Sequence, residues 1–305
     1  MTRLTAIVPA TNEPPTLARC LAAIRGSDEA PEELVVVEEP SGAGPAAARN
    51  AGAARASGDV LVFVDADVVV HPEAFARIRA AFAGDPHLDA VFGSYDDDPE
   101  ADGVVSSFRN LLHHHVHQSS AGPASTFWAG LGAVRAEPFS RAGGFDAERF
   151  AAPSVEDIDL GLRLSAAGAR IRLDPSVLGK HLKAWSLRDM VLTDVTRRGA
   201  PWVALLLRDG GAGSRSALNL GWRHRLSAAA ALAGTAGALT GRRRVAAGSF
   251  AALLVLNADF YALLARRRGA PTALAGVGLH VVHHLASAAS VPVGVISYLR
   301  ERAGS

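Results

Sequence analysis

The chain has 305 residues, enough for one large domain and an appended region. Its 31 Lys and Arg residues against 30 Asp and Glu residues leave a net charge of +1, and no basic and aromatic module of the kind that reads DNA or RNA appears, so no nucleic-acid partner is expected. Hydrophobic residues make up 49% of the chain and charged residues only 20%, which indicates that part of it is buried in lipid or against a partner.

The single cysteine, Cys20, excludes an internal disulfide, and we expect it to be a small buried residue on the first helix. The first strand begins within about three residues of the N-terminus, and no charged-then-apolar leader precedes it. A cleavable signal is therefore not expected.

The N-terminal part of the sequence predicts alternating strands and helices. We expect strands at residues 4–9, 33–37 and 60–64, and helices at residues 16–25 and 46–56. This spacing is typical of right-handed β-α-β units with a parallel sheet, and the continuous Val, Ile and Leu runs indicate that helices cover both faces. The expected fold class is α/β, with a Rossmann-like, mostly parallel sheet.

Acidic side chains follow each of these strands. Asp65 and Asp67 end the third strand, Glu13 follows the first, and Glu38 and Glu39 follow the second. The carboxyl ends of parallel strands are where open α/β sheets bind ligands, and two carboxylates one residue apart suit Mg²⁺ or Mn²⁺ carrying a diphosphate. Taken alone, Asp65-Ala66-Asp67 could equally be a solvated loop.

Five blocks of sequence together resemble the family-2 nucleotide-sugar glycosyltransferases, which are inverting enzymes of the GT-A fold. The blocks occur in the family's order within residues 1–185: 7–13, 48–52, 58–67, 143–146 and 156–161. The resemblance implies a GT-A catalytic domain that transfers a sugar from a nucleoside diphosphate donor, with Mg²⁺ or Mn²⁺ as cofactor.

The same resemblance implies roles for individual residues. Asp67 would bind the metal, with Asp65 near the metal or the ribose and His181 as a further metal or diphosphate contact. The donor would contact a set of residues at the strand ends and on the second helix: Pro9, Thr11, Glu13, Glu38, Glu39, Arg49, Asn50 and Asp65. The family commonly has aspartates where this chain has Glu38 and Glu39, which is a departure at the usual uridine contact.

The resemblance also implies a general base at the start of a predicted helix, residues 155–167. Asp157 would take the proton of the acceptor hydroxyl, with Glu156 as its partner. Acids at a helix N-terminus are also favoured by the helix dipole, which leaves a purely structural role open. Arg198 would be a further donor contact, because it lies in a segment that faintly resembles the Trp motif of processive synthases, but the segment lacks the leading Gln and the final Arg-Trp. Processive polymer synthesis is therefore not favoured.

Four histidines, His113, His114, His115 and His117, look like a metal cluster. Consecutive residues point around a helix, so only His113 and His117 would share a face. We do not expect a metal site there.

The C-terminal third accounts for the excess of apolar residues. An amphipathic stretch (186–225) precedes three apolar segments (226–240, 245–265 and 272–298), which arginine triplets separate. The second and third segments are long enough to cross a hydrocarbon core, which needs roughly 20 helical residues. A soluble helical subdomain or a dimer interface is the alternative, because a set of polar residues would be costly facing lipid: Asn257, Asp259, His280, His283 and His284.

The sequence as a whole predicts a catalytic domain (1–185), an interfacial region (186–225) and a hydrophobic helical region (226–305). We expect a glycosyltransferase at the cell membrane, its catalytic domain cytoplasmic, acting on a lipid or lipid-linked hydroxyl. One alternative is a polyprenyl-phosphate glycosyltransferase, whose anionic acceptor needs no base. Another is a non-catalytic membrane binding module, although a binder has no need of both acidic pairs.

Overall fold

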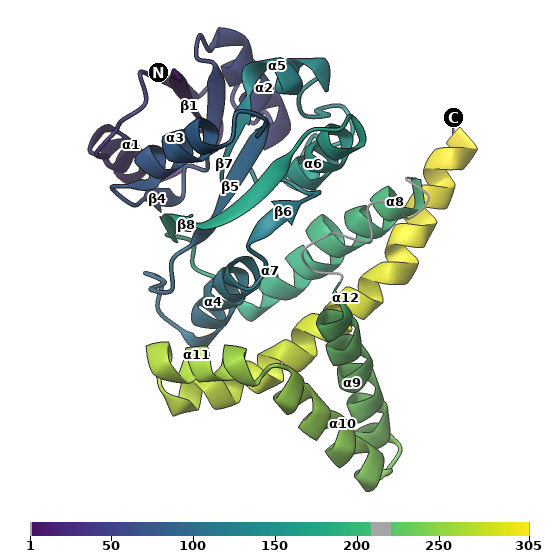
Figure 1. Cartoon of the computed structure of the whole chain (residues 1–305). Coiled ribbons are helices and arrows are strands. Elements are labelled where there is room, and N and C mark those ends of the chain that lie inside the picture. Colours follow the sequence, from purple (N-terminus) through teal and green to yellow (C-terminus); the bar gives the residue numbers. More distant parts are fainter. Residues whose placement is uncertain (1, 209–220, 305) are drawn as a thin grey trace. The chain divides into compact units, whose positions relative to one another are not determined.

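The computed structural model describes residues 2–208 and 221–304, which group into two compact units (Figure 1). The first unit contains the residues up to Asp96 together with Val116–Lys183, and the second contains Asp97–His115 and the residues from Ala184 onward. Residues 97–115 therefore belong with the C-terminal helices although they lie within the predicted catalytic range.

The first unit is built on a sheet whose strand order is β2-β1-β3-β7-β5-β8-β4. The three strands predicted from sequence are confirmed, as β1 (Leu4–Pro9), β2 (Glu33–Val37) and β3 (Val60–Val64). Both β2 and β3 pair parallel with β1, so all three end at one edge of the sheet. The strand-end acids predicted above therefore share that edge.

The remaining strands make the sheet mixed. They are β4 (Val68–Val70), β5 (Ala90–Tyr95), β6 (Gly122–Ala124), β7 (Leu131–Arg135) and β8 (Ile171–His181). β7 is antiparallel to β3 and to β5, while β8 is parallel to β5 and antiparallel to β4 and β6. The half of the sheet formed by β1, β2 and β3 is thus parallel, and the other half carries antiparallel pairs.

Helices cover both faces of the sheet, as its apolar strands require. Alternate residues of β1 and β3 pack against α1 (Leu17–Arg25) and α3 (Ala74–Gly84) in one buried cluster that includes Cys20. The other face meets α2 (Pro45–Arg55) and α5 (Ala136–Arg141), where Phe63 packs on Phe139. The last helix of this unit is α6 (Glu156–Ala166). The predicted burial of Cys20 is confirmed.

The second unit is helical. Its elements are α4 (Val104–Gln118, up to His115), α7 (Leu187–Leu192), the π-helix η1 (Thr193–Gly199), α8 (Ala200–Arg208), α9 (Trp222–Leu239), α10 (Arg243–Leu256), α11 (Ala258–Arg268) and α12 (Ala270–Gly304). Phe108 and Leu111 of α4 pack with Phe260 and Leu264 of α11 in its core. α9 and α10 run side by side as a hairpin (Figure 1).

The apolar segment 245–265 is not one straight helix. α10 and α11 meet at Asn257 with a bend of 69°. The Asn257 amide donates to Ser227 Oγ and to the Leu253 carbonyl, both at 2.9 Å, and these bonds hold the residue outside helical geometry. In the described part of the chain, Ala270–Ala303 is long and apolar enough to cross a membrane, and α10 with α11 would add a second crossing only if the bent pair counts as one span.

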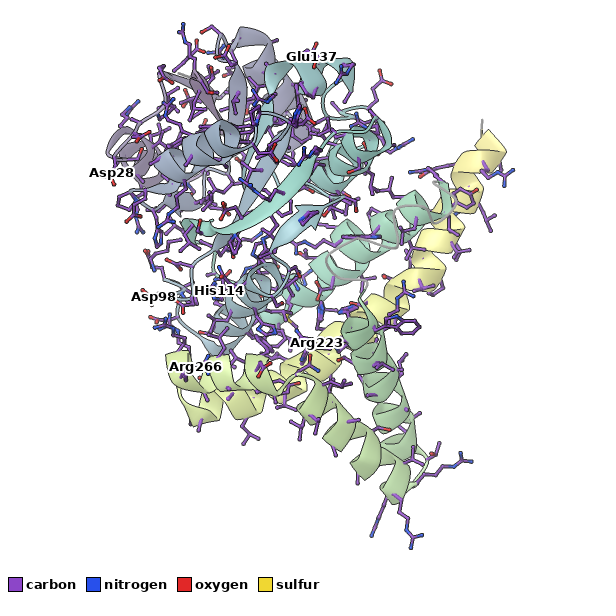
Figure 2. The ribbon with its side chains drawn as sticks, in the orientation of Figure 1. Asp28, Asp98, His114, Glu137, Arg223 and Arg266 are labelled. Carbon is purple, nitrogen blue, oxygen red and sulfur yellow. The ribbon has the colours of Figure 1, made fainter. Side chains whose placement is uncertain are left out.

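Of the polar residues that the sequence singled out in the apolar segments, Asn257, His280 and His284 are buried in the helical unit, whereas Asp259 is exposed. His280 bonds to the Tyr261 hydroxyl at 2.9 Å, and His283 bonds to Asp194 at 2.7 Å. Asp194 also pairs with Arg109 of α4 at 2.7 Å. The exposed charge of this unit includes Arg223, at the start of α9, and Arg266, on α11 (Figure 2). The helices therefore bury His280 and His284 and present apolar residues such as Val255 and Leu274 outward.

Candidate functional site

Asp65 and Asp67 lie at the edge of the sheet where β1 and β3 end. Their side chains are 31% and 33% exposed, so both carboxylates are reachable. The Val68 amide donates to the Asp65 carbonyl at 2.9 Å, closing a turn that leads directly into β4. The pairing of β4 with β8 then sets Val68 opposite His181.

His181 stands beside Asp67 because of this register. Its Nε2 lies 3.4 Å from Asp67 Oδ2. Burial acts to raise the pKa of Asp67, but the hydrogen bond and charge of His181 outweigh it and lower that pKa. A carboxylate and an imidazole at this spacing form two adjoining donors of the kind that Mn²⁺ accepts.

Arg49 ties Asp65 to the other acidic pair. Its guanidinium is buried, 2.7 Å from Asp65 Oδ1 and 2.9 Å from Glu156 Oε1. Burial opposes the charge of Arg49, yet the two carboxylates raise its pKa and keep it cationic. Burial raises the pKa of Asp65, and Arg49 opposes that rise. Arg49 therefore holds α2, β3 and α6 together at the site.

The acidic pair at the start of α6 divides into two environments. Glu156 is buried, and its Oε2 accepts a hydrogen bond from the Ser154 amide at 2.9 Å. Asp157 is half-buried, and its Oδ2 accepts from the Ala129 amide at 3.2 Å. Of the two, Asp157 is the one with a carboxylate partly open to solvent.

The expected donor residues at the ends of β1 and β2 are also placed at this edge. Thr11 is buried and its hydroxyl donates to the Ala43 carbonyl, while Pro9 pairs with Val37. Glu13 is exposed and has φ of 49°, a left-handed conformation that is uncommon for a residue other than glycine. Glu38 and Glu39 are exposed as well.

Asn50 holds the Gly143-Gly144 turn rather than facing solvent. Its side chain bonds to both the amide and the carbonyl of Phe145, at 2.9 and 2.7 Å. Gly144 has φ of 68°, and a side chain there would collide with the Asn50 amide oxygen. Arg198 lies on η1 in the second unit.

The last histidine of the run 113–117 has a structural partner in the first unit. His117 bonds to the Gly93 carbonyl at 2.8 Å and packs on Phe92 in the first unit. In residues 2–208 and 221–304 no three His, Cys, Asp or Glu side chains are arranged to hold an ion.

Two aromatic residues at the site were not predicted from the sequence. Tyr95, the last residue of β5, stacks on the His181 imidazole with centroids 4.2 Å apart and planes 7° apart. Trp128 meets Tyr95 edge to face at 4.9 Å. The position of Tyr95 as an aromatic residue at the end of a buried strand could have indicated its place at the site. Trp128 lies in a segment without a periodic pattern, so the sequence offered no such indication.

Comparisons with known proteins agree with this geometry. Residues 31–141 match the profile of Glycosyl transferase family 2. A pre-mycofactocin glycosyltransferase of Mycobacterium tuberculosis is 29% identical over 212 residues, covering 62% of this chain and 44% of the relative. A validoxylamine A glucosyltransferase of Streptomyces hygroscopicus subsp. limoneus is 28% identical over 219 residues, covering 54% and 48%. The matched region thus spans less than half the length of these curated relatives.

A solved structure shares the fold over most of the chain. It is a mannosyltransferase from Pyrobaculum calidifontis in complex with GDP-Man and Mn²⁺, with a TM-score of 0.54, 18% sequence identity, and coverage of 94% of this chain and 87% of that one. Together with the family match, it supports the expected fold. Residues 31–141 thus form a glycosyltransferase family 2 domain, and the chain shares the GT-A fold.

Proposed function

We propose that this protein is a metal-dependent inverting glycosyltransferase that moves a sugar from a nucleoside diphosphate donor to a hydroxyl acceptor. The observation that carries the proposal is the set of accessible carboxylates at one sheet edge, with Asp67 beside His181 and Asp157 held by the Ala129 amide. Such a site has a metal-binding side and a proton-accepting side, and a binding module needs only the first.

The side chains of Asp67 and His181 are of types that fit a divalent cation. Asp67 and His181 would hold Mg²⁺ or Mn²⁺, and the imidazole favours Mn²⁺. When bound, the ion would neutralise the charge that develops on the diphosphate leaving group. Arg49 contributes by fixing Asp65 beside that position, since its guanidinium is shared between Asp65 and Glu156.

Asp157 acts on the acceptor. The acceptor oxygen attacks the anomeric carbon from the face opposite the diphosphate, the bond to the diphosphate breaks, and the hydroxyl proton passes to Asp157. The hydrogen bond from Ala129 to Oδ2 fixes the carboxylate in orientation. General-base assistance of this kind contributes about 10²- to 10⁴-fold in rate.

The acceptor and location form a further part of the proposal. We place the protein at the cell membrane with its catalytic domain cytoplasmic and its acceptor a lipid or a lipid-linked hydroxyl compound. The apolar length of α12 and the exposed apolar residues of α9 and α10 support membrane association. Full-length protein should resist carbonate extraction from membranes. Its release into the soluble fraction would contradict this part.

The activity is tested by incubating membranes that contain the full-length protein with a panel of labelled nucleotide sugars and extracting into organic solvent. Asp157→Asn keeps the shape of the side chain but removes the base, so transfer should fall about 10²- to 10⁴-fold while donor affinity stays nearly unchanged. Glu137→Gln, an exposed acid on α5 (Figure 2), is the matched control and should retain full activity.

Two results would change the proposal. If Asp157→Asn keeps most of its activity, the acceptor is a phosphate that needs no base, and a polyprenyl-phosphate glycosyltransferase becomes the better description. If the wild-type protein binds nucleotide but turns over no donor, it is a binding module.

A further inference from the structure

An aromatic wall, Tyr95 with Trp128, joins the metal side of the site to the base side. Tyr95 stacks on His181, whose Nε2 faces Asp67. Trp128 meets the Tyr95 ring at 90° and is followed directly by Ala129, whose amide binds Asp157. The wall therefore runs from the residue that would hold the ion to the residue that would accept the proton.

Two glycines fix Trp128 in this place. The indole packs closely against Gly130, where an added Cβ would come within 2.4 Å of the ring. Gly161 of α6 lies against the Thr126-Phe127 backbone, where a Cβ would be 2.2 Å from the Phe127 amide nitrogen. This close approach brings the start of α6, with Asp157, next to the segment that carries Trp128. The indole is half-buried, part of it packed on the core of the sheet.

The two rings of the wall differ in what they can offer a ligand. Tyr95 is 8% exposed and one of its faces is covered by the His181 imidazole. Trp128 is more exposed and adjoins the base candidate. The apolar face of a sugar ring packs well on an aromatic surface, and an indole with a polar edge suits a ligand that is apolar on one face and polar around its rim.

We infer that Trp128 is the platform on which the ring of the acceptor stacks, so that the acceptor hydroxyl is carried by a sugar-like ring rather than by a bare alkyl chain. The inference rests on the proposed function and narrows its acceptor class. Stacking on Trp128 orients the ring so that one of its hydroxyls meets Asp157. Trp128 thereby determines acceptor specificity, while Tyr95 positions His181 and leaves the acceptor untouched.

Binding of simple probes to the full-length protein in detergent, with UDP or GDP and Mn²⁺ present, tests this inference. The probes are the methyl pyranosides of glucose, mannose and galactose, and the open-chain polyol glycerol. Trp128→Leu should weaken pyranoside binding about 3- to 10-fold and leave glycerol and nucleotide binding unchanged, whereas Trp128→Phe should stay within about twofold of wild type. Equal losses for pyranosides and glycerol would show that Trp128 only supports the structure.

A second measurement avoids dependence on the folding of the Leu variant. The protein has four tryptophans, and in protein labelled with 5-fluorotryptophan the Trp128 signal is assigned from the spectrum of Trp128→Phe. A pyranoside should shift this signal and glycerol should not. No shift with any of the three pyranosides would overturn the inference, and weaker nucleotide-sugar binding in Trp128→Leu would move the platform to the donor. Failure of the proposed function appears separately, as absence of nucleotide release by the wild-type protein.

Discussion

One carboxylate pair in the first unit and one carboxylate in the second unit have opposite environments. Asp65 and Asp67 in the first unit are about one-third exposed at the end of a strand. Asp194 in the second unit is 3% exposed and enclosed by Arg109 and His283. An accessible carboxylate can exchange water for a ligand, whereas an enclosed one is already fully satisfied by protein partners. The proposed ligand site thus lies in the unit with the accessible carboxylates, whereas Asp194 holds helices of the second unit together.

Removal of the enclosed carboxylate should have the largest effect on stability. Asp194→Ala removes the carboxylate that pairs with the buried Arg109, and breaking a buried pair in this way costs about 3–5 kcal/mol. Chemical unfolding in detergent measures the loss. Asp102→Ala, an exposed acid of the same unit, is the control and should change the unfolding free energy by less than about 0.5 kcal/mol. An Asp194→Ala variant as stable as this control would break the comparison.

The reverse result is expected at the accessible site. Asp67→Ala should reduce Mn²⁺-dependent binding of UDP or GDP at least about tenfold, because the ion loses its carboxylate ligand, while stability changes by less than about 1 kcal/mol. Calorimetric titration with and without chelator measures the binding. Asp28→Ala in the α1–β2 loop (Figure 2) serves as the control, since that loop lies at the edge where β2 begins. Undiminished metal-dependent binding by Asp67→Ala would remove Asp67 from the metal site.

Removal of a surface carboxylate should have the smallest effect on the free energy of unfolding, and this effect should depend on pH. Glu32 accepts from Arg79 and from the Leu4 amide, and although burial acts to raise its pKa, these bonds lower it to about 2. A lowered pKa stabilises the fold above the unfolded value of 4.5, and this stabilisation is lost as the pH falls toward 2. Glu32→Gln should therefore cost about 0.2–1 kcal/mol at pH 7 and nothing near pH 2, as thermal unfolding would show. A loss of equal size at both pH values would mean that charge is not the cause.

Continuous apolar runs made the parallel half of the sheet predictable. β1, β2 and β3 lie where the Val, Ile and Leu residues of 4–9, 33–37 and 60–64 placed them, and Asp65 and Asp67 follow β3 as expected. The sequence also singled out His181, and the structure shows why this residue lies beside Asp67. β4 has only three residues, and its pairing with β8 is a tertiary contact that no local pattern specifies.

The sequence did not reveal the side-chain partners of Arg49 and Asn257. Arg49 was expected at the donor, and the structure shows it between Asp65 and Glu156, 107 residues away from the latter. The apolar pattern around Asn257 predicts one continuous helix, because the helix propensity of Asn is only modestly below that of its neighbours. The break at Asn257 involves a hydrogen bond to Ser227, which is 30 residues away in the sequence. Both roles depend on partners distant in sequence.

Cys20 offers a direct record of how often this site opens. Its thiol is buried under β3 and donates to the Asp65 carbonyl at 3.6 Å, and burial, with a further contribution from Asp65 and Asp67, raises the pKa of the thiol to about 12. A thiol reagent can then react only in those moments when α1 lifts from the sheet. Since the chain has no other cysteine, the rate of thiol labelling reports how often α1 separates from the sheet next to Asp65. No engineered probe is needed for this measurement.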